Sequence, residues 1–479
     1  MVLRLQAEID WHETKQPAYR QIYQRVVALI STGQLPPGGR LPAIRTLAHE
    51  LGLAQGTVEA AYDLLSAEGY IIAKGAAGTF VSAQLPLRVS AVEAPAEAAE
   101  VMEVTADPNR TAQALPLQMG LPALDAFPTK LWARLSTKRM QAWTAADLAY
   151  PPAAGYAPLR SELAKYLRLA RGIVCRPEQI VVVAGYQAAL ALLAQLLGVA
   201  NRQVWLEDPG YVFGRAAWRQ AGAEIVPVPV DEEGLCVAAG LALAPTACCA
   251  VVTPAHQSPL TVSLSLARRL ALLDWAARTG GWVIEDDYDG EYRYRGWPLP
   301  ALSSLDQAER CITVGTLSKV LFPGLRLAYV VLPPALVAPA GQALQHSSYS
   351  PALLGQQVLT DFMQAGHFSR HIKKMRRLYA ERRAMVMTVF QQRLSPWLNI
   401  AAEAGGMHLV AKVQPPYRDV WLAERAQAQG MAVQALSHWA IAPAQAQQGL
   451  LFGFANVVDI AQAQAYAEAL AQAWASADA

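Results

Sequence analysis

The chain of 479 residues is longer than one hydrophobic core usually supports, so its length predicts two or three domains. Its formal net charge of +2 excludes a strongly charged whole-chain surface for nucleic acid or membrane, and any DNA contact must be local. Five cysteines without zinc-site spacing indicate free thiols in a reducing cytoplasm and no metal site. We expect no export signal, because charged residues follow the first methionine within a few positions.

The first 82 residues alternate helical stretches with glycine-rich turns. Residues 17–33 place apolar side chains on one helical face between Pro17 and Gly33. Two further helical stretches, IRTLAHELG and AQGTVEAAYDLLSAEG, each end at a glycine, and YIIAKGAAGTFV is typical of two short strands around a turn. This order of elements predicts a winged helix-turn-helix DNA-binding domain over residues 1–82.

A recognition helix places its first residues in the major groove of double-stranded DNA. The predicted base contacts are therefore Gln55 and Thr57, with Glu59 as a further candidate. The predicted phosphate contacts are Arg40, Arg45 and Lys74. Against DNA binding, the first 88 residues carry eight Lys or Arg and seven Asp or Glu, a weak positive balance for such a surface.

Residues 83–116 are rich in Ala, Pro and Glu without a sustained period, which predicts a linker. From residue 117 to 479, strand-like runs such as QIVVVAG, QVWLEDPG, CCAVVTP, GWVIEDD and CITVGT alternate with helical ones. This alternation predicts an α/β domain with a mostly parallel sheet. The uncharged run at 179–201 is long enough for a membrane span, but Gly185 and two glutamines favour strand, turn and buried helix.

Two motifs of this second domain suit an aldehyde cofactor with a pyridine ring and a phosphate, as in pyridoxal phosphate. Such a cofactor needs a lysine for a Schiff base, a carboxylate for its ring nitrogen, and a ring plane to stack on. VIEDDYDGEY places Asp286 at the end of a strand, with Tyr288 suited to donate to the ring oxygen. GTLSKVLFPGLR supplies Lys319.

The phosphate needs N–H, hydroxyl and arginine groups, and the same domain offers each of them. The AGYQ turn opens a helix whose free N–H groups favour an anion. EDPGY offers Tyr211 as a stacking plane. The candidate phosphate residues are Gly185, Tyr186, Gln187, Thr316, Ser318 and Arg326. Each piece alone has an ordinary alternative, such as a solvated acidic loop or a structural lysine, so the prediction depends on their combination.

The two halves carry a resemblance to known families. LPPGGRLPAIRTLAHELGLAQGTVEAAYDLLSAEGYIIAKGAAGTFV resembles the winged helix of GntR-type regulators. GYAPLRSELAKYLRLARGI, EDPGY, TPAHQSP, EDDYDGEYRYRG and TLSKVLFPGLRLAYVVLPP resemble fold-type I aminotransferases. Their order along the chain resembles that of the MocR (GabR-like) transcriptional regulators, which join the two domains.

The resemblance implies roles for individual residues. Lys319 would be the Schiff-base lysine, Asp286 the ring-nitrogen partner, Tyr288 the ring-oxygen partner and Tyr211 the stacking residue. The remaining candidates would hold the phosphate. It also implies a head-to-tail homodimer, because cofactor sites of this fold lie at a subunit interface.

Three positions differ from the patterns of these families. Ala54 and Gln55 stand where GntR-type proteins commonly have Ser-Arg, which puts the usual base contact in doubt. Leu451, in GLLFGFAN, stands where aminotransferases carry the arginine that clamps a substrate carboxylate. The turn at residues 258–261 reads Ser-Pro-Leu-Thr in place of Phe-Pro-Thr-Gly, so the amino-acid pocket is also in doubt.

We therefore expect a cytoplasmic transcriptional regulator that binds operator DNA and pyridoxal phosphate and senses a small-molecule effector. The effector would be the cofactor itself or an amino compound without the usual α-carboxylate. One alternative is a genuine aminotransferase with an appended DNA-binding head, although the missing arginine argues against efficient turnover. Another is a DNA-binding dimer whose large domain is an inert scaffold.

Overall fold

The computed structural model describes residues 16–85, 114–294, 300–345, 349–401, 405–442 and 446–475. The chain divides into two compact units, Met1–Thr105 and Ala106–Ala479. This division falls within the predicted linker at 83–116, of which residues 86–113 lie outside the described residues. In the part of the chain that is described, no helix is both long and apolar enough to cross a membrane.

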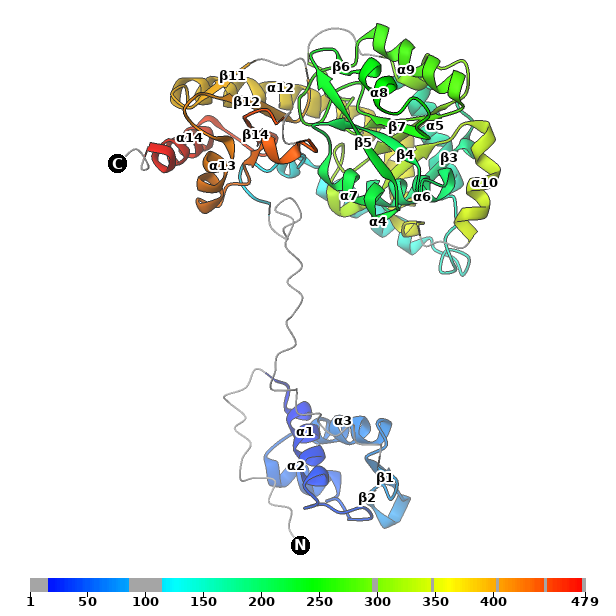
Figure 1. The fold of residues 1–479 in the computed structure, drawn as a ribbon. Coiled ribbons are helices and arrows are strands. Elements are labelled where there is room, and N and C mark those ends of the chain that lie inside the picture. The colour runs from blue at the N-terminus through cyan, green and yellow to red at the C-terminus, as the bar shows by residue number, and fades with distance from the viewer. Residues whose placement is uncertain are drawn as a thin grey trace. The chain divides into compact units, whose positions relative to one another are not determined.

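The N-terminal unit has the predicted winged helix-turn-helix fold (Figure 1). Its elements are α1 (Ala18–Ser31), α2 (Ile44–Leu51), α3 (Gln55–Ala67), β1 (Ile71–Ala73) and β2 (Thr79–Val81). Ile22, Leu47, Val58 and Leu65 are fully buried and join the three helices in one small core. The two strands pair antiparallel around the turn that contains Lys74 and form the wing.

The second unit is built on an eight-stranded sheet. In spatial order its strands are β3 (Ile180–Val183), β10 (Ala328–Val331), β9 (Cys311–Thr316), β8 (Trp282–Asp287), β7 (Cys249–Val252), β4 (Gln203–Asp208), β5 (Glu224–Asp231) and β6 (Gly234–Leu235). The five strands from β9 to β5 are parallel, whereas β10 runs antiparallel to both neighbours. The prediction of a mostly parallel α/β sheet is confirmed.

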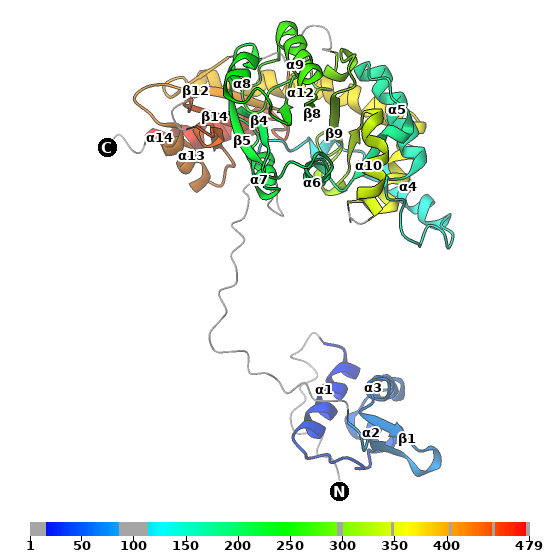
Figure 2. The ribbon, with the colours of Figure 1, turned by 45° about the vertical axis from the view of Figure 1, so that its right-hand side comes forward.

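Helices cover both faces of this sheet (Figures 1 and 2). On one face lie α6 (Tyr186–Leu197), α7 (Val212–Gln220) and α10 (Pro334–Gln345), and on the other lie α8 (Val237–Leu243) and α9 (Leu266–Thr279). The other helices that precede the small sheet are α4 (Thr129–Gln141), α5 (Ala157–Arg171), α11 (Leu353–Gln364) and α12 (His367–Arg393). The uncharged run at 179–201 is thus β3 followed by the buried helix α6, as predicted.

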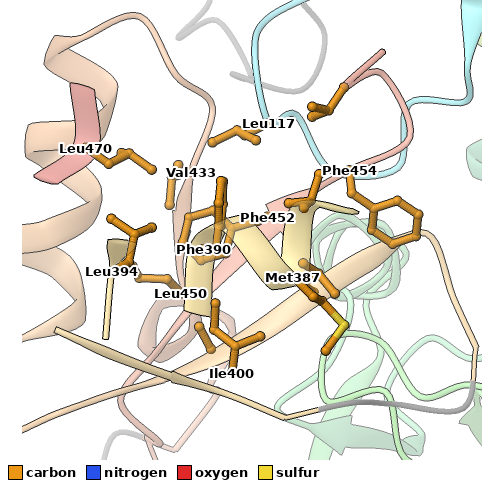
Figure 3. Packing of buried hydrophobic residues seen from close by; sticks show 14 of the residues in the cluster. Leu117, Met387, Phe390, Leu394, Ile400, Val433, Leu450, Phe452, Phe454 and Leu470 are labelled. Carbon is orange, nitrogen blue, oxygen red and sulfur yellow. The ribbon is translucent and has the colours of Figure 1, made fainter. Parts of the chain in front are cut away.

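A smaller antiparallel sheet follows near the C-terminus. Its strands, in spatial order, are β11 (Leu398–Ile400), β12 (His408–Val413), β14 (Gly449–Gly453) and β13 (Gln434–Ala435), and it packs with α12, α13 (Asp419–Ala428) and α14 (Ile460–Ala475). Leu450 and Phe452 of β14 point into this core with Phe390 and Leu470 (Figure 3). Leu451 lies between them in the strand and therefore faces the opposite side.

The large sheet is tightly packed around Gly315, which lies in β9 four residues before Lys319. A Cβ at Gly315 would lie 2.1 Å from Cζ of Tyr329 on β10. Gly315→Ala is therefore expected to lower the free energy of unfolding by about 2–3 kcal/mol, measured by urea denaturation of the full chain.

Gly341→Ala is the matched control for that substitution, because Gly341 lies in helix α10 and a Cβ there meets nothing within 4 Å. It is expected to raise stability by about 0.5–1 kcal/mol, since alanine loses less backbone freedom on folding. Equal effects of the two substitutions would contradict the tight packing of β9 on β10.

Candidate cofactor site and DNA-binding surface

The cofactor candidates gather where the parallel strands end. Asp286 is the penultimate residue of β8 and lies opposite Val314 of the neighbouring β9. Thr316 ends β9, and Lys319 follows three residues later. Tyr211 follows β4 and caps the N-terminus of α7. Because the carboxyl ends of adjacent parallel strands share one edge, these residues lie at the same edge of the large sheet.

Asp286 is buried with an incomplete set of partners. Its side chain is 7% exposed, and Oδ1 has no hydrogen-bond partner among the described residues. Burial raises the pKa of this carboxyl group to about 8, although a hydrogen bond with Tyr186 opposes the shift. A pyridine nitrogen that carries a proton would supply both a donor and a countercharge, so this carboxyl group fits the ring-nitrogen role.

Two tyrosines line the pocket that contains Asp286. Tyr186 and Tyr211 are in edge-to-face contact, with ring centroids 5.8 Å apart. Tyr211 is 37% exposed, which leaves part of its ring available for stacking. The side chain of Tyr186, a predicted phosphate residue, is bonded to Asp286 instead, so its backbone N–H is the group that could face a phosphate.

An anion-binding arrangement lies at the start of α6. Gly185 caps this twelve-residue helix with a φ of +98°, and Arg326 Nη2 donates to the carbonyl oxygen of Ala184 at 3.1 Å. A Cβ at Gly185 would lie 2.9 Å from Cζ of Arg326, so only glycine allows the guanidinium to approach. Gln187 lines a groove together with Arg326. A helix N-terminus and an arginine side by side fit a phosphate.

The two predicted hydroxyl groups lie in the turn between β9 and Lys319. Ser318 donates its backbone N–H to Thr316 Oγ1 at 3.3 Å, and Thr316 is buried. No described contact joins either hydroxyl group to Arg326. Their place in a phosphate site thus remains a prediction.

Lys319 is held by a residue that the sequence did not single out. Its Nζ donates to the carbonyl oxygen of Gly120 at 2.7 Å, and a Cβ at Gly120 would lie 2.4 Å from that nitrogen. The segment around Gly120 is the first described part of the second unit, and Gly453 of β14 donates to the carbonyl oxygen of Leu117 at 2.8 Å. An isolated glycine carries no sequence signal for such a contact.

One buried ion pair and two hydrogen bonds fix the acidic turn that follows Asp286. Arg171 Nε lies 2.6 Å from Asp287 Oδ2, and Arg171 Nη1 donates to the carbonyl oxygen of Gly290 at 3.2 Å. Tyr166 donates to Glu291 Oε1 at 2.6 Å. Successive residues of β8 point to opposite faces of the sheet. Asp287 is therefore paired with Arg171, while Asp286 faces the pocket.

Tyr288 lies beside a buried histidine. Its hydroxyl oxygen is 3.0 Å from His256 Nδ1, and burial raises the pKa of the phenol well above its usual value. A phenol that keeps its proton can donate a hydrogen bond, which is the role predicted for Tyr288. His256 was not among the predicted site residues.

The structure shows the surroundings of Leu451 and the backbone conformation of Thr261, two positions that differ from the aminotransferase pattern. Leu451 is fully buried in an apolar cluster with Leu436 and Trp439, so no arginine of β14 reaches this side. Thr261 has a φ of +65°, a left-handed conformation that a β-branched residue rarely adopts. The family pattern has glycine at that position, which tolerates this conformation without strain.

The DNA-binding candidates lie on two parts of the N-terminal unit. Gln55 begins α3 and is exposed. Thr57 lies two residues later in the same helix and is half-buried. Arg45 is exposed near the start of α2. Lys74 lies in the turn of the wing, and its Nζ is 5.2 Å from the ring centroid of Phe80. The backbone of Arg40 forms an antiparallel β-bridge with Phe80. The helix start and the wing are the two parts with which such a domain would contact DNA.

Comparison with known proteins matches both units. Residues 18–81 match the model of bacterial regulatory proteins of the gntR family, and residues 132–446 match aminotransferase class I and II. The chain is 37% identical to the probable rhizopine catabolism regulatory protein MocR of Rhizobium meliloti, over 92% of this chain and 90% of that protein. The chain belongs to the MocR-type family of transcriptional regulators.

A second regulator supports this assignment, and a solved structure resembles the second unit. The pyridoxine biosynthesis transcriptional regulator PdxR of Corynebacterium glutamicum is 32% identical over 91% of each chain. The second unit resembles the α-aminoadipate aminotransferase LysN of Thermus thermophilus, solved with N-(5'-phosphopyridoxyl)-L-leucine. The TM-score is 0.68 at 26% identity, covering 76% of this chain and 92% of that one.

The buried Asp286 predicts a pH dependence of the cofactor-free protein. Because burial raises its folded-state pKa to about 8, the folded protein holds this proton more tightly than the unfolded chain. The free energy of unfolding should fall as pH rises from about 4 to about 8, by on the order of a few kcal/mol. Asp286→Asn should make this decline shallower in urea titrations at pH 5 and pH 8.

Asp274→Asn is the matched control, because Asp274 lies exposed on α9 in an ion pair with Arg278. It should leave the pH dependence as in the wild type. Glu207 and Glu291, whose pKa values burial raises to about 7, account for the decline that remains in Asp286→Asn. A decline of unchanged slope in Asp286→Asn would contradict the burial argument.

Proposed function

We propose that this MocR-type regulator is a cytoplasmic protein that binds operator DNA with its winged helix and pyridoxal phosphate through Lys319. One observation carries the cofactor proposal: Asp286 buries an oxygen without a partner at the sheet edge where β9 leads to Lys319. Burying a polar group without a partner is costly, and a ring nitrogen would remove that cost. The guanidinium of Arg326 beside the start of α6 supplies the phosphate end of the same site.

The roles of the protein's own groups follow from their positions. Bound pyridoxal phosphate would supply an aldehyde that forms a covalent bond with an amine. Lys319 would provide that amine in place of its present bond to Gly120, and Asp286 would hold a proton on the ring nitrogen. Arg326, Gly185 and the first N–H groups of α6 would bind the phosphate, and Tyr211 would stack on the ring.

The effector is proposed to be pyridoxal phosphate itself or an amino compound without an α-carboxylate. The apolar surroundings of Leu451 support this choice, because burying a carboxylate against apolar side chains is costly. Two relatives are named for regulating rhizopine catabolism and pyridoxine biosynthesis, so MocR-type proteins differ in what they control.

The contact between Lys319 and Gly120 supports an allosteric connection through which the cofactor site affects the winged-helix domain. Gly120 follows shortly after the predicted linker. A covalent bond between the cofactor and Lys319 Nζ would change the hydrogen bond that the carbonyl oxygen of Gly120 accepts from that nitrogen. An effector that alters this contact would favour one arrangement of the segment over another. Such differential contact is what allosteric coupling requires.

A head-to-tail homodimer belongs to the same proposal. A groove of about 860 Å³ runs between α6 and α7 and reaches Arg326 and Tyr349. Much of its lining is alanine, so the groove offers an apolar surface directly beside the phosphate candidates. A second copy in this groove would place the subunit interface at the cofactor site.

A genuine aminotransferase is the second candidate, and its support is the likeness of the second unit to LysN and the presence of both Asp286 and Lys319. The two candidates differ in one measurement. Sustained multiple turnover with an amino donor and a keto acid would favour the enzyme, whereas at most a single half-reaction fits a regulator.

Lys319→Ala tests the covalent attachment directly. The purified wild-type protein incubated with pyridoxal phosphate should show a visible absorption band that borohydride abolishes, because Lys319 holds the cofactor. Lys319→Ala should lack that band. Lys165→Ala, which removes an exposed lysine of α5, is the control and should keep the band.

The same proteins test the effector proposal. On a DNA duplex enriched from a random library by the wild type, adding pyridoxal phosphate at constant salt should change the affinity of the wild type but not of Lys319→Ala. Unchanged wild-type affinity would exclude the cofactor as effector. A protein that takes up no cofactor would leave the large unit as a scaffold and refute the proposal.

The DNA contacts make a separate prediction on that duplex. Gln55→Ala should cost about 1–3 kcal/mol of binding and relax the preference at one base position, because it removes a base contact. Arg45→Ala should weaken binding to all sequences and reduce the slope of log affinity against log salt by about one. Gln24→Ala, exposed on α1, is the control, and an equal loss in all three would contradict these roles.

A further inference from the structure

We propose that His256 is a positioning residue that directs the hydroxyl hydrogen of Tyr288 toward the ring oxygen of the bound cofactor. The inference depends on the proposed function, because it assigns a role toward that cofactor. It starts from three side chains that come from two different loops. His256 follows β7, whereas Tyr288 and Asp289 follow β8.

One nitrogen of His256 faces two oxygen atoms. Nδ1 lies 3.0 Å from the hydroxyl oxygen of Tyr288 and 3.1 Å from Oδ2 of Asp289. The carboxylate of Asp289 can only accept a hydrogen bond, so a lone pair on Nδ1 would be repelled by it. The geometry therefore favours the tautomer with the hydrogen on Nδ1.

This tautomer determines what Tyr288 can do. The hydrogen on Nδ1 is then donated to the hydroxyl oxygen of Tyr288, while Oδ2 of Asp289 lies 3.1 Å from Nδ1 without a hydrogen bond. A phenol that accepts this hydrogen keeps its own hydrogen for another acceptor. That hydrogen then points away from His256, toward an acceptor in the pocket.

The ring of His256 is buried and closely packed against Gly406. It is 7% exposed, and a Cβ at Gly406 would lie 1.9 Å from its Cε1, so the ring fills a space that only glycine leaves open. Nε2 has no hydrogen-bond partner among the described residues, so no acceptor there competes for the hydrogen placed on Nδ1.

The charged and titratable groups around His256 keep this arrangement. From the β8 side they are Asp289 and Tyr288, and from β12 it is His408, whose ring centroid lies 5.7 Å away. Burial lowers the pKa of His408 to about 4, and its Nε2 bonds to the carbonyl oxygen of Pro259, so His408 is a neutral neighbour. Repulsion from His256, and to a smaller extent from Lys319, lowers the pKa of His408 further, so the two histidines do not both carry a positive charge.

The consequence appears at the nitrogen of Lys319. A hydrogen bond from Tyr288 would withdraw negative charge from the ring oxygen, which makes a proton held beside that oxygen at Lys319 Nζ easier to lose. Without His256, the hydroxyl hydrogen of Tyr288 can turn to other acceptors such as Asp289. The proton at Lys319 Nζ should then be held to higher pH.

The test compares His256→Leu, His256→Asn and Asp289→Asn in the full-length protein loaded with pyridoxal phosphate. The measurement is the pH midpoint of the visible absorption change, together with the dissociation constant for the cofactor. His256→Leu should raise the midpoint by about one pH unit. His256→Asn should stay near the wild type, because its amide hydrogen can replace the one on Nδ1. Asp289→Asn should shift the midpoint in the same direction as His256→Leu, since Nδ1 is then no longer held as a donor.

The possible results separate this inference from the proposed function. A wild type without a visible band refutes the proposed function and the inference with it. A normal wild-type band with unshifted midpoints in His256→Leu and Asp289→Asn refutes the inference alone. Weaker cofactor binding without a midpoint shift would show that His256 only packs the site. If His256→Leu fails to fold, the midpoint of Asp289→Asn still decides between these results.

Discussion

The second unit depends on how four acidic side chains at the end of β8 are distributed. Asp286 faces the pocket, Asp287 pairs with Arg171, Asp289 with His256, and Glu291 with Tyr166. Unpaired, several buried carboxylates this close would repel one another and oppose folding. Arg171 and Tyr166 lie on α5 and His256 follows β7, so two separate parts of the chain fix the turn that carries Asp286 and Tyr288.

This distribution connects the fold to the site. The ion pair with Arg171 restrains Asp287 on one face of the sheet and so directs Asp286 to the other, where its carboxyl group lacks one partner. The same turn presents Tyr288 to His256. Gly185 and Gly120 complete the site in another way, because the absence of a side chain lets Arg326 and Lys319 reach their positions.

Much of this architecture could be predicted from the sequence, because short-range patterns determine it. Seven of the eight strands between residues 180 and 331, all except the two-residue β6, and the winged helix follow from apolar periodicity and glycine punctuation. The reversed direction of β10 could not be predicted, since an apolar run carries no information on strand direction. The four-stranded C-terminal sheet was foreseen only at β14, because β11 and β13 are too short to show a period.

The candidate site divides in the same way. Asp286, Tyr288 and Lys319 lie within recognisable motifs, and the structure places them at one sheet edge. Arg171, His256 and Gly120 act through contacts with residues far away in the sequence. Gly120 and Lys319, for example, are 199 residues apart, and no local pattern shows such a contact. Tyr186 shows the limit of motif reasoning, because its side chain bonds to Asp286 and leaves only its backbone for a phosphate.

Under the proposed function, the leucine at position 451 has a consequence for the choice of effector. An arginine on that face of β14 would let amino acids with an α-carboxylate compete for Lys319. An apolar wall makes a buried carboxylate costly and so discriminates against this whole class of molecules. Under the proposed function, the residue that disfavours turnover of amino acids would also keep them from competing with the effector.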